Sequence, residues 1–155
     1  MIQKMIEPKH GRKLNVHLSK ATDLHGHFGP FLTLGLRMGL LGLRELATRK
    51  GDPGLQVTVS LEYALPFSCM LDGIQSSTRC TVGNKRLRWK ESKEFGAVFL
   101  NQNSGRVVEV KINPNVVQEL RLKLANTKPK DETVRQIALE IWGRSEKELF
   151  SVSTR

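Results

Sequence analysis

Cysteine is scarce in this sequence, because its 155 residues include only two, Cys69 and Cys80. A disulfide-dense scaffold of the small secreted kind is therefore excluded. No export signal accompanies them, so we expect two thiols, although their spacing also allows a disulfide. Their chemistry has to be argued from the residues around them.

Long uncharged apolar runs are also missing. The first residues, MIQKMIEPKHGRKL, contain no apolar segment of the signal-peptide kind. The most apolar segment, residues 30–47, carries Arg37, Arg44 and Glu45. A charge near the centre of a bilayer costs at least ~2.5 kcal/mol. The sequence thus predicts a cytoplasmic protein that makes no contact with a membrane.

Acidic residues are few, since 15 Asp and Glu stand against 25 Lys and Arg and leave a net charge of +10. A field of this sign attracts polyanions and acidic partners. The densest basic stretch, residues 79–93, also holds Leu87 and Trp89 in alternation with charged residues. That alternation is typical of a half-exposed strand, which we prefer. A basic module that binds RNA is retained as an alternative.

The length predicts a single domain over residues 1–155, large enough for its own core. Its clearest strand is LQVTVSLEY at 55–63, where apolar and polar residues alternate. Proline at the first turn predicts helices that begin at Pro30 and Pro66. Leu14, Val16 and Leu18 alternate like a short strand or extended arm. Further strands are expected at 85–90, 96–102 and 106–112, with a hairpin turn at 103–105 and helices at 114–126 and 132–143. This order predicts an α+β fold with a mixed sheet, with a core at 20–112 and C-terminal helices at 114–143.

Three glycines share one face of the first long helix. Gly35, Gly39 and Gly42 are spaced at i, i+4 and i+7. Each costs a helix roughly 0.5 to 1 kcal/mol relative to alanine, so a packing requirement must outweigh that loss. We expect a buried helix pressed against a sheet or another helix. A homodimer contact is the alternative use of this face.

Two groups with the chemistry of a functional site stand at the starts of helices. His25 and His27 precede the helix that begins at Pro30, and Cys69 falls in the first turn of the next. The helix dipole should favour the thiolate of Cys69. If the two helix ends meet, imidazole and thiolate ligands converge, a mixture that suits zinc or a similar metal. Asp72 lies on the same helix face as Cys69 and could orient such a ligand.

Simpler interpretations exist for both groups. A His-Gly-His segment is commonly a surface loop, and a cysteine in an apolar helix is commonly a small core residue. A thiol enzyme is a further alternative, with Cys69 as nucleophile, a histidine as base and the helix terminus as an anion site.

Three blocks of the sequence resemble the FmdE (FwdE-like) family of formylmethanofuran dehydrogenase subunits. They are DLHGHFGPFLTLGLRMG, PFSCMLDGIQ and CTVGNKRL, in the family's order and covering about residues 20–112. The resemblance implies a fold of the FwdE/GAPDH-domain type, with a core order of helix, strand, helix and three strands. It also implies a metal site, with zinc as the expected ion.

The resemblance assigns roles residue by residue. His25, His27 and Cys69 match the family's metal-binding positions. Arg37, Asp72, Gln75 and Cys80 match further polar or cysteine positions, where they would bind a ligand or support the metal ligands. One departure is Gly29, because the family usually has a cysteine before the proline. Three protein ligands still suffice for a catalytic zinc with an open position, or the site has lost its metal.

The function implied is that of a small metal-binding protein. It would be an accessory to a molybdenum or tungsten formylmethanofuran dehydrogenase, bound to the other dehydrogenase subunits, or a stand-alone relative with a small-molecule or anionic ligand. Nothing in the sequence indicates a molybdopterin site, so it is not expected to be the catalytic subunit.

Overall fold

A five-stranded mixed sheet organises the structure, a computed structural model that describes residues 16–128 and 131–155. The strand order is β2-β1-β3-β4-β5. The β1–β2 pair is parallel, and the other three neighbouring pairs are antiparallel. The strands are β1 (Leu55–Leu61), β2 (Leu87–Glu91), β3 (Gly96–Asn101), β4 (Val107–Ile112) and β5 (Phe150–Thr154). The α+β class and the mixed sheet expected from the sequence are confirmed.

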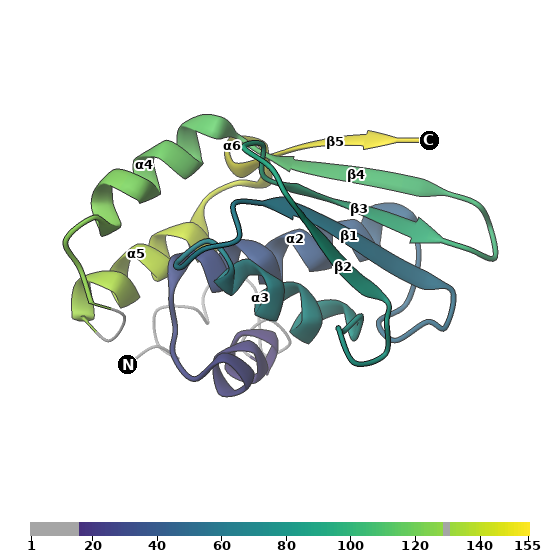
Figure 1. Cartoon of the computed structure of the whole chain (residues 1–155), viewed down its shortest axis with the longest axis horizontal. Coiled ribbons are helices and arrows are strands. Elements are labelled where there is room, and N and C mark those ends of the chain that lie inside the picture. Colours follow the sequence, from purple (N-terminus) through teal and green to yellow (C-terminus); the bar gives the residue numbers. More distant parts are fainter. Residues whose placement is uncertain (1–15, 129–130) are drawn as a thin grey trace.

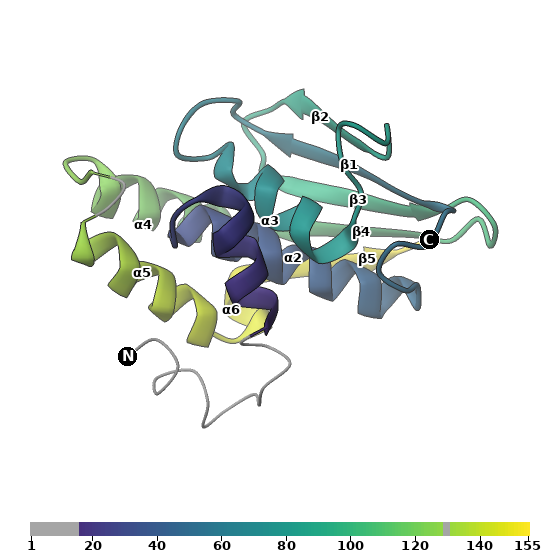
Figure 2. The same cartoon turned by 90° about the horizontal axis from the view of Figure 1, so that it is seen from below.

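Helices cover one face of this sheet. They are α2 (Pro30–Leu46), α3 (Cys69–Thr78), α4 (Pro114–Leu124), α5 (Glu132–Gly143) and the short α6 (Glu146–Leu149). A further helical segment spans residues 16–25. Figures 1 and 2 show α2 and α3 along one side of the sheet, with α4 and α5 extending beyond its end. Alternate residues of β1 are buried toward the helices, whereas those between them are partly exposed. No helix of the described residues covers the opposite face.

The glycine face of α2 is filled within the chain. A Cβ added at Gly35 would lie 2.1 Å from the backbone oxygen of Met70 in α3, and one at Gly39 would lie 1.8 Å from Ser77 Oγ. Gly42 faces the ring of Phe99 in β3, and Gly73 of α3 faces the backbone of α2. The predicted packing against a neighbouring helix and a sheet is confirmed. This face therefore offers no free surface for a dimer contact, and the homodimer stays a prediction without that argument.

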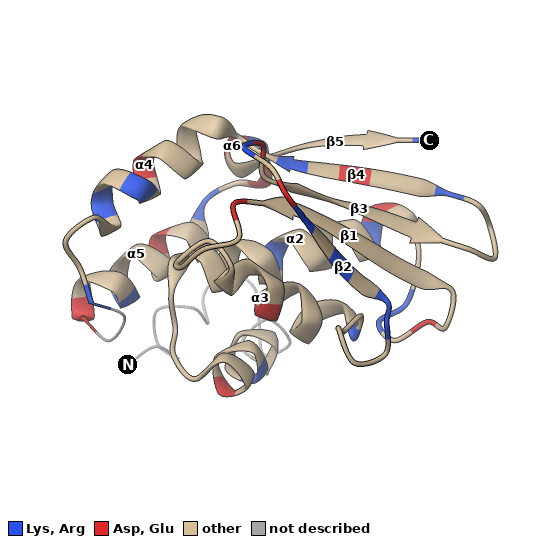
Figure 3. Ribbon diagram, in the orientation of Figure 1, with Lys and Arg blue, Asp and Glu red and all other residues tan. Residues whose placement is uncertain are grey.

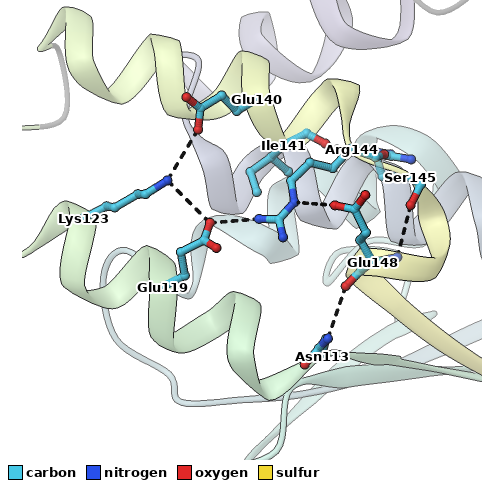
Figure 4. Close-up of polar contacts among 9 residues, drawn as sticks. Asn113, Glu119, Lys123, Glu140, Ile141, Arg144, Ser145 and Glu148 are labelled. Carbon is cyan, nitrogen blue, oxygen red and sulfur yellow. Dashed lines mark hydrogen bonds and ion pairs between the residues drawn. The ribbon is translucent and has the colours of Figure 1, made fainter.

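Polar contacts bind the C-terminal helices together. Arg144, just after α5, donates to Glu119 of α4 at 2.8 Å and to Glu148 of α6 at 3.1 Å. Lys123 lies between Glu119 and Glu140, at 3.6 and 3.5 Å (Figure 4). Because α4 and α5 are linked side by side, their facing surfaces can form one wall of a pocket.

Several elements differ from the sequence expectations. Residues 16–25 are helical, so Val16 and Leu18 do not belong to a strand or extended arm, and Leu14 lies outside the described residues. The alternation was misleading because Leu18 is buried while Val16 is 48% exposed, as on two sides of a helix. Pro66 does not open α3, which begins at Cys69 after a turn closed by the Cys69 N–H to Pro66 C=O bond.

The C-terminus was also incompletely predicted. The last residues form α6 and then β5, which pairs with β4, so the chain does not finish in helices. The FSVST segment of β5 has one buried residue, Phe150, and four exposed ones. An edge strand of this kind carries little hydrophobic alternation, and its pairing comes from the backbone.

No helix of the described residues is long and apolar enough to cross a membrane.

Candidate functional site

The two histidines lie in a tight connection between two helices. The segment 16–25 ends at His25, where the Gly26 N–H donates to Thr22 C=O at 2.8 Å. Gly26 has φ of +96°, a backbone conformation that only glycine adopts easily. The chain then turns through His27 to Gly29, the residue before the first turn of α2. The rings of His25 and His27 come to 4.6 Å between centroids, so the imidazoles form a side-by-side pair.

A carboxylate of α3 holds His25. The Asp72 carboxylate accepts a hydrogen bond from His25 Nδ1 at 2.6 Å, across 47 residues of sequence. Its other oxygen accepts from Gln75 Nε2 at 2.9 Å, and the side-chain carbonyl of Gln75 accepts from the Val82 N–H at 3.2 Å. Asp72 and Gln75 therefore fix the orientation of the His25 ring from behind.

The other nitrogen of His25 is left without a partner. Nε2 is buried and makes no hydrogen bond within the described part of the chain. Since Nδ1 carries the proton given to Asp72, the neutral ring keeps its lone pair on Nε2. This is the carboxylate–histidine arrangement that supports metal-binding histidines in proteins. A buried nitrogen left unpaired has an energetic cost, which a bound ligand would remove.

Cys69 lies at the first residue of α3 and is 7% exposed. Burial, together with the nearby Asp72 carboxylate, raises the pKa of its thiol to about 11. The thiolate expected from the helix dipole is therefore not favoured in the protein alone. Desolvation and a like charge outweigh the dipole here, and only a cation brought close to the sulfur would reverse the balance.

One pocket contains the three residues that the sequence singled out. His25, His27 and Cys69 line a cavity of about 300 Å³. The rest of its wall is mainly apolar and comes from α2, from the turn before α3 and from the ends of α4 and α5. These residues are Gly29, Pro30, Phe31, Leu32, Leu65, Pro66, Leu124, Thr127 and Val134. The fold therefore brings together the two helix starts, as the predicted site required.

Gly29 opens space directly beside His27. A Cβ at this position would lie 3.3 Å from His27 Nε2 and 3.7 Å from a methyl group of Val134. A side chain at residue 29 would therefore be next to the second imidazole. The absence of one leaves that part of the pocket empty of protein atoms.

Arg37 and Cys80 lie elsewhere. The Arg37 guanidinium donates to Ile141 C=O at 2.8 Å and also to Arg144 C=O, so it binds the carbonyl end of α5. Burial lowers the pKa of Arg37. Cys80 is fully buried in the core, and its thiol donates to Leu55 C=O at 3.5 Å. Neither residue lines the pocket.

The fit to a metal ion is incomplete without ligand movement. Within residues 16–128 and 131–155, no three His, Cys, Asp or Glu side chains are arranged as a ready-made metal site. The paired imidazoles, the unpartnered Nε2 and the adjacent thiol nevertheless supply nitrogen and sulfur donors that suit zinc. The residues thus fit a metal chemically, provided that binding draws the donors closer.

The basic stretch at 79–93 is divided among several elements. Arg79 ends α3, and Lys85 lies in the following turn. In β2, Arg88 and Lys90 are exposed, while Trp89 stacks on Tyr63 at 5.2 Å between centroids. Figure 3 shows basic residues along β2 and toward both ends of β4. The RNA-binding alternative is not tested by this placement.

Comparison with known proteins assigns the chain to a family. Residues 24–151 match the family described as "FmdE, Molybdenum formylmethanofuran dehydrogenase operon". The chain belongs to the FmdE family. The match extends past the three blocks that carried the resemblance and includes the C-terminal helices of this FmdE protein.

Two relatives give the context of this FmdE chain. A curated protein of Archaeoglobus fulgidus, named "Probable S-adenosyl-L-methionine-binding protein", is 27% identical over 107 residues, which cover 69% of this chain and 29% of that protein. The chain thus spans less than a third of that relative. A solved structure from Syntrophus aciditrophicus, described as an FmdE-like protein of the tungsten formylmethanofuran dehydrogenase type, has a TM-score of 0.60 and 21% identity, over 91% of this chain and 71% of that one. This second similarity shows a shared fold.

Some pocket residues could not be found from the sequence alone. Leu124, Thr127 and Val134 come from the C-terminal helices and the link between them, which lie outside the three blocks of the resemblance. The apolar spacing of these helices predicted that they pack against something, but it contained no information about which surface they cover.

Proposed function

We propose that this FmdE protein is a small cytoplasmic metal-binding protein, accessory to a formylmethanofuran dehydrogenase-type enzyme. The observation that carries the proposal is the state of His25. Its Nδ1 is fixed by Asp72, its buried Nε2 has no partner in the described chain, and its ring pairs with His27 beside Cys69. These features favour a divalent transition metal, with zinc as the expected ion.

His25 and His27 would hold the ion through ring nitrogens, and Cys69 would complete a three-ligand set after a side-chain rotation. Bound zinc would supply a Lewis acid with an open coordination position. Asp72 keeps the His25 proton on Nδ1, so that Nε2 stays available. The Cys69 thiol must lose its proton on binding, so uptake of the metal should release a proton and strengthen as pH rises.

The apolar remainder of the pocket supports a second component. Phe31, Leu32 and Leu124 leave room for a small molecule next to the histidines. The cavity volume of about 300 Å³ lies at the lower end of the usual range for ligand sites. The name of the Archaeoglobus relative agrees with small-molecule binding, although only a small part of that protein is shared. We infer that the accessory role includes binding a compact, largely apolar ligand at the metal.

Zinc titration of protein purified without a histidine tag tests the metal proposal. Isothermal titration calorimetry of the apo-protein should give one zinc per chain. The His25→Ala and Cys69→Ser variants should bind zinc at least about tenfold more weakly. Cys80→Ser is the matched control, because this thiol is buried away from the pocket, and it should bind like the wild type.

Two outcomes would contradict the proposal. A metal-free preparation that does not respond to added zinc would exclude a zinc site. Equal loss of affinity in Cys69→Ser and Cys80→Ser would show that the cysteine effect is structural. Co-purification with dehydrogenase subunits tests the accessory role separately, so a failure there would leave the metal site standing.

A further inference from the structure

A second cleft lies at the end of the sheet where β3 begins and β4 ends. It measures about 540 Å³ and lies between the turn before β3, helices α4 and α6, and the start of β5. It shares no lining residue with the histidine pocket. The size is within the usual range for small-molecule sites.

Positive charge dominates the lining of this cleft. Lys93, Lys111, Arg121 and Lys147 reach it from four different elements, while Glu94 is the acidic residue that lines it. Bringing like charges together is unfavourable unless counter-charge is present. An excess of cations gathered by the fold from distant parts of the chain therefore marks a place where an anion would be stabilised.

Only part of this charge is neutralised by the protein. Arg121 forms an ion pair with Glu62 and lies 4.6 Å above the ring of Phe67, so its position is fixed. The nearest carboxylate to Lys111 is Glu109, at 4.0 Å. Within the described residues, Lys93 and Lys147 make no ion pair. Two lysines are thus available to a ligand without breaking an existing contact.

The helix start in the cleft adds little to this field. Pro114 has no N–H, and the N–H of Asn115 already donates to the Asn113 side chain at 3.0 Å. Binding would depend on the lysine side chains, which makes it open to test by mutation.

The floor of the cleft is apolar. Phe95, Ile112, Val117 and Phe150 line it and are each no more than 7% exposed. A cationic rim above an apolar floor suits a molecule that has a charged end and a hydrophobic body. We propose that this cleft binds a small organic anion, whose phosphate or carboxylate group contacts Lys93, Lys111 and Lys147 and whose apolar part lies on Phe95 and Phe150.

Nuclear magnetic resonance titration of the ¹⁵N-labelled full chain tests this site, with phenyl phosphate and inorganic phosphate as probes. Phenyl phosphate should cause saturable shifts at cleft amides and bind at least about fivefold more tightly than inorganic phosphate, because only its ring contacts the floor. The combined Lys111→Gln and Lys147→Gln variant should weaken binding about tenfold, in a salt-dependent way. The matched control is Lys20→Gln with Arg49→Gln, which removes the same charge from exposed residues outside the cleft and should change binding less than about twofold.

Each outcome of the titration decides the question. Saturable shifts confined to the cleft, lost in the cleft variant and kept in the control, would support the site. Equal weakening in both variants would mean that phosphate responds to net charge, which overturns the proposal. Equal affinity for the two probes would refute contact with the floor, and a carboxylate probe, benzoate, then compares the two classes of charged group. Spectra of the variants also report whether each remains folded.

Discussion

Replacing Gly35 with alanine should separate α2 from α3. The added Cβ would lie 2.1 Å from the Met70 carbonyl oxygen, whereas ordinary contact begins near 3.4 Å, so the helices must move apart by about 1 Å. Backbone atoms oppose the methyl group, and no flexible side chain can yield in their place. Overpacking of this kind costs about 1–3 kcal/mol or more, against a gain of at most about 1 kcal/mol in helix propensity.

The net loss should be about 2 kcal/mol, which corresponds to a fall of roughly 4–8 °C in melting temperature for a chain of this size. Thermal unfolding followed by circular dichroism measures it. Gly143→Ala is the matched control, because no atom lies within 4 Å of a Cβ there, and it should be neutral or slightly stabilising. A Gly35→Ala protein as stable as the control would refute the close packing of α2 on α3. The same displacement should loosen the His25–Asp72 contact, since these residues flank the two helices.

Three further predictions concern the pocket and its support. Asp72→Asn should weaken zinc binding about 10- to 100-fold in calorimetry while melting close to the wild type, and unchanged affinity would contradict its role behind His25. In a Cys80→Ala background, native Cys69 should react with iodoacetamide at pH 8 about 100-fold more slowly than in urea, because its pKa is raised to about 11; equal rates would refute its burial. The unfolded thiol ionises first, so Cys69 contributes stability that is present below pH 9 and lost as pH rises toward 11, measured by urea unfolding across that range. Arg37→Ala should cost about 2 kcal/mol in urea unfolding by leaving the buried carbonyl of Ile141 without its donor, whereas the exposed ion pair of Arg44 with Glu146 should be worth less than about 1 kcal/mol when broken by Arg44→Ala.

The sequence was most informative where one residue type has one physical use. The alternation in 55–63 predicted β1, and Pro30 marked the start of α2. Three glycines at helical spacing indicated close packing, which α3 and Phe99 supply. The Asn-Ser-Gly link predicted the β3–β4 hairpin, where Gly105 has φ of +74°.

Other features depended on the whole fold. The Cys69 pKa could not be predicted from its place at a helix start, because the local dipole is weaker than burial and the charge of Asp72. Arg37 looked like a ligand-binding residue, but in three dimensions it meets the end of α5, more than a hundred residues later. β5 was missed because its pairing with β4 involves backbone groups that leave no pattern in the side chains.

The span of 47 residues between His25 and Asp72 means that the pocket exists only while the two segments are docked. An ion held there would act as a clasp between them and would have no comparable site in the unfolded chain. At a hundredfold excess over its dissociation constant, such a ligand would add about 2.7 kcal/mol to stability. Screening metals and small molecules by the rise in unfolding temperature could thus reveal the natural occupant before any assay of activity exists.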